Sequence, residues 1–64
     1  MDDKQKEIKI KEHLKKLNYL LGKERYDEVK IMCDELIPYW NDYNDKLMVD
    51  FFEKQLKTIN KILS

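Results

Sequence analysis

The chain has 64 residues, 13 of them basic and 13 acidic, so its formal net charge at pH 7 is zero. This length predicts a single domain that covers residues 1–64. One cysteine and one histidine exclude an intrachain disulfide and give no basis for a metal cage or another cofactor site. The neutral charge does not favour nucleic-acid binding, which usually needs a basic domain.

No apolar run approaches the roughly 20 residues of a transmembrane helix, so no membrane segment is expected. The polar start of the chain also lacks the apolar core of a signal peptide. With its free cysteine, the chain is therefore expected in the cytoplasm. Lysine outnumbers arginine twelve to one, which suggests an AT-rich genome such as that of a low-GC bacterium, its phage or a plasmid. The base composition of the coding DNA would test that origin.

The first predicted helix covers residues 3–21. Its apolar residues are spaced by four, three and four positions, which places them on one helix face. They are Ile10, Leu14, Leu17 and Leu21. Gly22, the only glycine, follows this face, where a left-handed residue often ends a helix. Gly22 is therefore the predicted C-terminal cap.

The next segment, Leu21-Gly22-Lys23-Glu24-Arg25-Tyr26-Asp27-Glu28-Val29, resembles the turn between the two helices of a tetratricopeptide repeat. In that family a glycine and an aromatic residue precede a small helical residue. The resemblance covers nine residues, and no second repeat follows. It implies an antiparallel helix hairpin and nothing further.

The second predicted helix covers residues 25–40. Its apolar positions again follow helical spacing and are Tyr26, Val29, Cys33, Leu36, Trp40 and Tyr43. Pro38 interrupts this run and removes one helical hydrogen bond. Two outcomes stay open: the helix kinks at Pro38, or it ends near Ile37. The unbroken spacing up to Tyr43 favours the kink.

The third predicted helix covers residues 44–63. Its apolar face is formed by Val49, Phe52, Leu56, Ile59 and Leu63. Short connections place successive helices side by side and antiparallel. The sequence therefore predicts an all-α protein, a small antiparallel three-helix bundle.

Charge is distributed unevenly along the neutral chain. Residues 1–23 carry seven lysines and four acids, a net charge of +3. Residues 24–53 carry three basic residues and nine acids, net −6, and residues 54–64 carry three lysines, net +3. One interpretation is attraction between neighbouring helices. The other is an acidic docking face for a basic partner protein, formed by Glu24, Asp27, Glu28, Asp34 and Glu35.

No residue pattern indicates catalysis. His13 has Lys9, Lys16 and Leu17 as helical neighbours, which offer no carboxylate to orient it, so a surface histidine is expected. Cys33 lies within an apolar helix face beside Asp34, which predicts a buried structural thiol rather than a reactive one. The carboxylates show no pattern of an acid–base pair in a pocket, and neither a phosphate-binding loop nor a nucleophile motif is present. The sequence predicts that the protein is not an enzyme.

Five of the seven aromatic residues lie between positions 39 and 52: Tyr39, Trp40, Tyr43, Phe51 and Phe52. Phe52 and Tyr26 fall on core faces. Trp40 and Tyr43 fit either the core or a contact surface. Tyr39 and Phe51 fall off the apolar faces and are expected to form an exposed patch, because aromatic residues are common at interface hot spots.

These features predict a small protein-binding module that regulates, links or inhibits another protein. Its partner would contact Tyr39, Trp40, Tyr43 and Phe51 or the acidic residues of the second helix. The alternative is a structural homodimer in which the leftover aromatic surface is the subunit interface. A light-scattering dilution series separates these two hypotheses.

Overall fold

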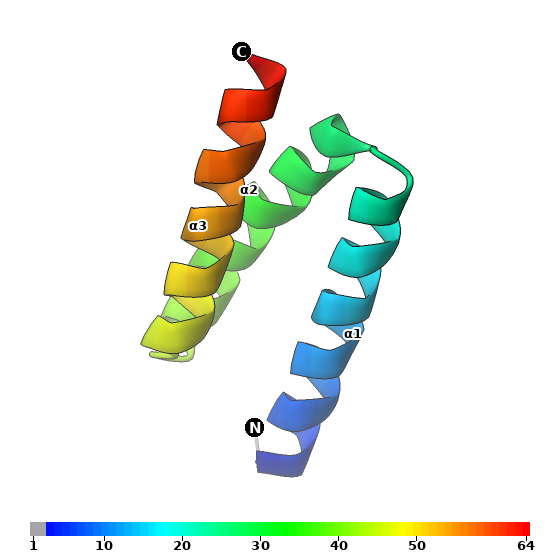
Figure 1. The fold of residues 1–64 in the computed structure, drawn as a ribbon. Coiled ribbons are helices and arrows are strands. Elements are labelled where there is room, and N and C mark those ends of the chain that lie inside the picture. The colour runs from blue at the N-terminus through cyan, green and yellow to red at the C-terminus, as the bar shows by residue number, and fades with distance from the viewer. Residues whose placement is uncertain (1–2) are drawn as a thin grey trace.

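The computed structural model describes residues 3–64 and contains three α-helices. They are α1 (Asp3–Gly22), α2 (Tyr26–Asp42) and α3 (Lys46–Leu63). Successive helices run in opposite directions (Figure 1). The predicted all-α three-helix fold is confirmed, and the predicted helix bounds agree with the structure to within two residues.

The three helices do not pack equally against one another. α2 packs closely along α3, and α1 packs against α2 less extensively. Within residues 3–64, no Cα atom of α1 lies within 8 Å of a Cα atom of α3. Figure 1 shows α1 and α3 spread apart, with α2 joining them. The bundle is therefore a closely packed α2–α3 hairpin, and α1 packs more loosely against α2 alone.

The core is built around α2, the helix that contacts both others. Four of the eight buried apolar residues belong to it; the full set is Leu17, Leu20, Val29, Met32, Cys33, Trp40, Phe52 and Ile59. Burying one large apolar side chain contributes about 1.5–3 kcal/mol. Leu20 lies off the predicted face of the first helix, yet only 4% of its surface is exposed. Leu20 is buried at the interface between α1 and α2.

The second helix continues through Pro38 and ends at Asp42, so the alternative that it ends near Ile37 is wrong. Proline cannot donate the hydrogen bond that the carbonyl four residues earlier would accept, that of Asp34. Both Pro38 and Asp34 are exposed, so water can satisfy this carbonyl. Packing of Ile37 and Trp40 on the core side holds the helix together past this position.

The turn between α1 and α2 is closed by backbone hydrogen bonds. The Arg25 N–H donates to the Leu20 carbonyl at 3.0 Å, and the Glu24 N–H donates to the Leu21 carbonyl at 3.1 Å. This pair of bonds defines a Schellman motif, which needs one left-handed residue. That residue is Glu24, with φ of 56°. The prediction that Gly22 is the left-handed cap is wrong, because Gly22 has no positive φ and is the last residue of α1.

The turn between α2 and α3 repeats this pattern twenty residues later. The Asp45 N–H donates to the Trp40 carbonyl at 3.1 Å, and the Asn44 N–H donates to the Asn41 carbonyl at 3.0 Å. Asn44 is the left-handed residue, with φ of 57°. Asp45 then caps α3, since its Oδ1 accepts the backbone N–H of Met48 at 3.2 Å.

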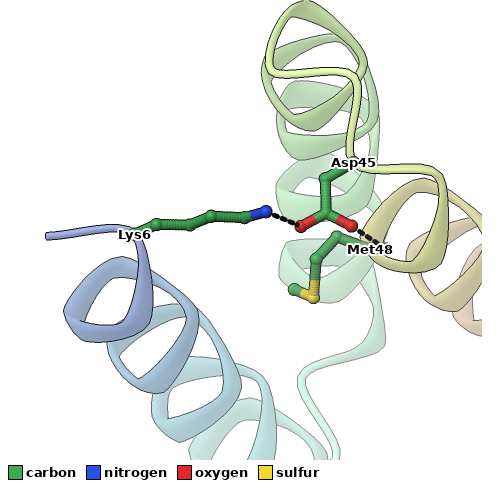
Figure 2. Close-up of polar contacts among 3 residues, drawn as sticks. All are labelled: Lys6, Asp45 and Met48. Carbon is green, nitrogen blue, oxygen red and sulfur yellow. Dashed lines mark hydrogen bonds and ion pairs between the residues drawn. The ribbon is translucent and has the colours of Figure 1, made fainter. Parts of the chain in front are cut away.

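An ion pair joins the start of α1 to this second turn. Figure 2 shows Lys6 extended from α1 toward Asp45, whose other carboxylate oxygen, Oδ2, lies 2.9 Å from the Lys6 Nζ. The Asp45 side chain is only 10% exposed. The bond to Lys6, followed by the bonds from the backbone of α3, lowers the pKa of Asp45 against the opposing effect of burial. One carboxylate thus caps α3 and contacts α1.

Candidate functional site

The aromatic residues of α2 form a cluster with His13 of α1 rather than an open surface. Trp40 lies at its centre and is fully buried. Its ring makes T-shaped contacts with the Tyr39 and His13 rings, with centroids 5.1 and 5.5 Å away, and its centroid lies 6.1 Å from that of Tyr43. Trp40 leaves no surface for a partner, so its predicted place in a contact surface is corrected to the core.

Tyr39 and Phe51 do not form the exposed patch expected from the sequence. Both are partly buried and pack against the core. Tyr39 packs against both Trp40 and Tyr43, and the Phe51 ring lies 5.2 Å from that of Phe52, which is fully buried as predicted. Of the four aromatic residues predicted to contact a partner, only Tyr43 is largely exposed, with 41% of its surface accessible.

His13 is not the plain surface histidine that its sequence neighbours predict. Its ring is half-buried against Tyr39 and Trp40, and its Nδ1 is buried without a hydrogen-bond partner. Burial, followed by the charge of Lys9, lowers the pKa of His13; Lys16 adds to this effect and Glu12 opposes it. The sequence could not show this environment, because it depends on how α1 lies on α2.

Cys33 is fully buried. Burial, with a smaller effect of Asp34, raises the pKa of the Cys33 thiol to about 11. A thiol reacts as its thiolate, and this environment suppresses the thiolate at neutral pH. The predicted burial of Cys33 in the apolar face of the second helix is confirmed.

The acids predicted to form a docking face are all exposed. Asp27, Glu28, Asp34 and Glu35 project from α2, and Glu24 lies in the turn before it. Glu28 is 3.6 Å from Arg25 in a surface pair within the same segment. In the part of the chain from Asp3 to Ser64, no ion pair joins any of these five acids to α1 or α3. Direct pairing between helices therefore does not account for the acidic character of α2.

An apolar residue lies in the middle of these acids. Ile31 is 58% exposed and is four residues from both Asp27 and Glu35, which places the three on one side of the helix. We call Asp27, Glu28, Ile31, Asp34 and Glu35 the α2 outer face. The sequence indicated that Ile31 is exposed, since Ile31 does not follow the core spacing of its helix. That it lies between the exposed acids is shown by the structure.

A shallow hollow of about 250 Å³ lies beside the α2 outer face. Lys16 and Leu20 of α1 line it together with Glu28, Ile31 and Glu35 of α2. Two of the lining residues are apolar and three are charged, a mixture that also occurs at protein-contact sites. The hollow brings no acid–base pair or nucleophile together.

Comparisons with protein-family models, with curated proteins and with solved structures gave no match. Across residues 3–64, no three side chains of the His, Cys, Asp or Glu type meet in an arrangement that could hold a metal ion. Among the same residues, none of the helices is both long enough and apolar enough to cross a bilayer.

Proposed function

We propose that this protein acts without catalysis, by binding a basic segment of another protein on the α2 outer face. By covering that segment, this protein would act as a regulator, adaptor or inhibitor of its partner. A cytoplasmic location goes with this proposal, because the free Cys33 suits a reducing compartment.

The observation that carries the proposal is the exposed Ile31 among exposed acids that, within residues 3–64, form no ion pair with α1 or α3. Interfaces commonly combine an apolar centre, which excludes water, with a polar rim, which sets specificity. Here Ile31 and the neighbouring hollow supply the centre, and Asp34 and Glu35 belong to the rim. The complementary partner is an amphipathic helix with an aliphatic residue between lysines or arginines.

Charge gives the proposed contact a measurable property. The acids of the α2 outer face are exposed, so their attraction for a cationic partner is screened by salt. Electrostatic complementarity mainly raises the association rate. We therefore expect association with the partner to slow markedly as salt rises from about 0.05 to 0.5 M, while dissociation changes less.

The test is to recover binding proteins from the host lysate with the tagged protein and then measure their affinity for variants. The charge-reversal pair Asp34→Lys with Glu35→Lys should weaken binding by more than about tenfold. Asp50→Lys with Glu53→Lys is the matched control, because these acids are exposed on α3 and their reversal changes net charge equally. Equal binding by both double variants would refute the α2 outer face as the site, and recovery of no specific partner would refute the function.

A homodimer is the second candidate function, and the exposed apolar side chains outside the α2 outer face favour it. Leu47 at the start of α3 is 83% exposed, the most of any large apolar side chain among the described residues. A subunit interface there would be disrupted by Leu47→Glu. Sedimentation over a dilution series decides this point, because a species that stays monomeric at every concentration excludes the homodimer.

A further inference from the structure

The turn between α1 and α2 is built from residues that favour a helix. Residues 23–25, which we call the hinge, are lysine, glutamate and arginine, all good helix formers. Glu24 nevertheless has a φ of 56°, a left-handed conformation that is unfavourable for a residue with a Cβ. The local sequence of the hinge therefore favours a conformation other than the one it adopts.

A continuous helix through the hinge would replace every backbone hydrogen bond of the turn. In the turn, the N–H groups of Glu24 and Arg25 donate to carbonyls near the end of α1. In a helix that runs from α1 into α2, each would donate to the carbonyl four residues earlier instead. The N–H groups of residues 26–28 would gain acceptors as well, because the first turn of α2 has none within its own helix and Arg25 provides no side-chain cap.

α1 is attached to the rest of the molecule in a way that a second copy can reproduce. Leu17 and Leu20 of α1 are buried, and the His13 ring lies 5.5 Å from that of Trp40. In the described chain no Cα atom of α3 comes within 8 Å of one in α1, and the Lys6–Asp45 ion pair joins α1 to the second turn. The charges also match, since residues 1–23 carry a net +3 and residues 24–53 a net −6.

We propose that two copies of this chain exchange their α1 helices: the hinge straightens, and each α1 packs on the α2 of the other copy. The dimer repeats the contacts of the closed form, so its surfaces are complementary without any further feature. The turn supported by Asn44 and Asp45 stays closed, so each α2–α3 hairpin is kept. This interface differs from a surface homodimer through Leu47, and it requires no other protein.

Exchange would change the composition of the hollow beside the α2 outer face. Lys16 and Leu20 of α1 line that hollow together with residues of α2. In the exchanged dimer each hollow is lined by two chains, and the dimer has two of them. A partner with two basic segments would then bind to both, with a gain in apparent affinity from the linkage between the segments.

The first experiment uses the unaltered protein, unfolded in urea and then refolded at low and high protein concentration. Exchange needs an open α1 and a second chain nearby, so mass action favours it when refolding takes place at about 1 mM rather than about 0.01 mM. Size-exclusion chromatography with light scattering should show a monomer at the lower concentration and a clear dimer fraction at the higher one. A monomer at both concentrations would overturn the proposal.

Hinge variants test whether the turn controls the dimer. Glu24→Gly relieves the strain of the closed turn and disfavours the continuous helix, so the dissociation constant of the dimer should rise by at least about tenfold. Glu24→Val should lower it severalfold, because a β-branched residue is poorly tolerated at positive φ. Asn44→Gly, the matched change in the second turn, should leave it unchanged. Equal dissociation constants for the two Glu24 variants would refute the exchange.

Isotope-filtered NMR identifies the interface in a dimer refolded from equal amounts of labelled and unlabelled chains. The chain has one histidine and one tryptophan, so their ring signals are unambiguous. In the exchanged dimer the neighbouring His13 and Trp40 rings belong to different chains, and cross-chain contacts between them are expected. Contacts within one chain only, or a dimer that Leu47→Glu abolishes and the hinge variants do not affect, would show a surface homodimer instead of an exchange.

Discussion

The α1–α2 and α2–α3 turns have the same backbone hydrogen bonds but different side-chain support. In the second turn, Asn44 tolerates the left-handed conformation and Asp45 caps the next helix. In the first turn the corresponding residues are Glu24 and Arg25, and Arg25 makes no side-chain cap. The same Schellman motif is therefore supported by side chains in the α2–α3 turn and by backbone hydrogen bonds alone in the α1–α2 turn.

This difference matches the packing of the helices on either side. The well-supported turn joins α2 to α3, the pair that packs closely, and the poorly supported turn joins α1, which leans on α2. Local turn chemistry and tertiary packing thus favour the same hairpin. We expect α2–α3 to be the more stable unit and α1 to open first.

The largest expected effect comes from the residues whose carbonyls close the turns. Trp40→Ala should lower the free energy of unfolding by about 3–5 kcal/mol, and Leu20→Ala by about 2–4 kcal/mol, because both side chains are buried and Trp40 is the larger. Urea denaturation followed by circular dichroism measures both. If either variant loses less than about 1 kcal/mol, the side chain at that end of its turn does not contribute to the core as proposed.

Asp45→Ala should lower the free energy of unfolding by about 1–2 kcal/mol, because it removes the α3 cap and the Lys6 ion pair. Asp45→Asn is the matched variant: it keeps a capping oxygen and loses only the ion pair, so its cost should be below about 1 kcal/mol. Thermal unfolding of both variants at neutral pH makes the comparison.

The cost of Asp45→Asn should depend on pH. The pKa of Asp45 is lowered in the folded state, first by Lys6, so the carboxylate stabilises the fold above its ordinary pKa of 3.8. That contribution is lost as pH falls through the lowered folded pKa. The two proteins should therefore differ least at the acid end of a pH series; a difference that grows there would contradict this assignment.

Moving the glycine to the left-handed position should stabilise the first turn. Gly22→Ala adds a Cβ that meets no atom within 4 Å, in a helical conformation that alanine favours. Glu24→Gly relieves the strain at φ of 56°. Together they should raise the free energy of unfolding by about 1–2 kcal/mol. Asn44→Gly, the same change in the second turn, should gain less than about 0.5 kcal/mol because asparagine already tolerates this conformation.

The smallest effect should come from giving α2 the type of cap that α3 has. Arg25→Asn places a capping oxygen at an N-cap position that has none, and should gain about 0.5–1 kcal/mol. Arg25→Ala is the control and should change stability by less than about 0.5 kcal/mol, since the contacts of Arg25 with Glu28 and Tyr19 are at the surface. If both variants have the same stability, the first turn cannot be improved by a cap.

Apolar spacing predicted the three helices and most of their core residues, because helix periodicity is a local property. It also favoured continuation past Pro38, which the structure shows. It misplaced the left-handed residue of the first turn, since a glycine near a helix end is a strong signal and Glu24 is not. The separation of α1 from α3 could not be predicted, because it depends on packing between distant residues.

The candidate site was predicted only in part. The exposure of the acids on α2 follows from their type and spacing. The burial of Trp40 and the partial burial of Tyr39 do not follow from residue type, because they depend on how the helices pack and on contacts such as those with His13. Residue type alone cannot decide between core and contact for an aromatic residue, since the same ring suits either environment.

The fully buried Cys33 can serve as a built-in chemical probe of how often the protein opens. An alkylating reagent reaches the thiol only when the α2 face that holds it opens, so the rate of labelling measures the frequency of opening. Cys33 is also the only cysteine in the chain. A disulfide-linked pair of chains on a non-reducing gel would therefore record molecules that had opened, rather than a native dimer.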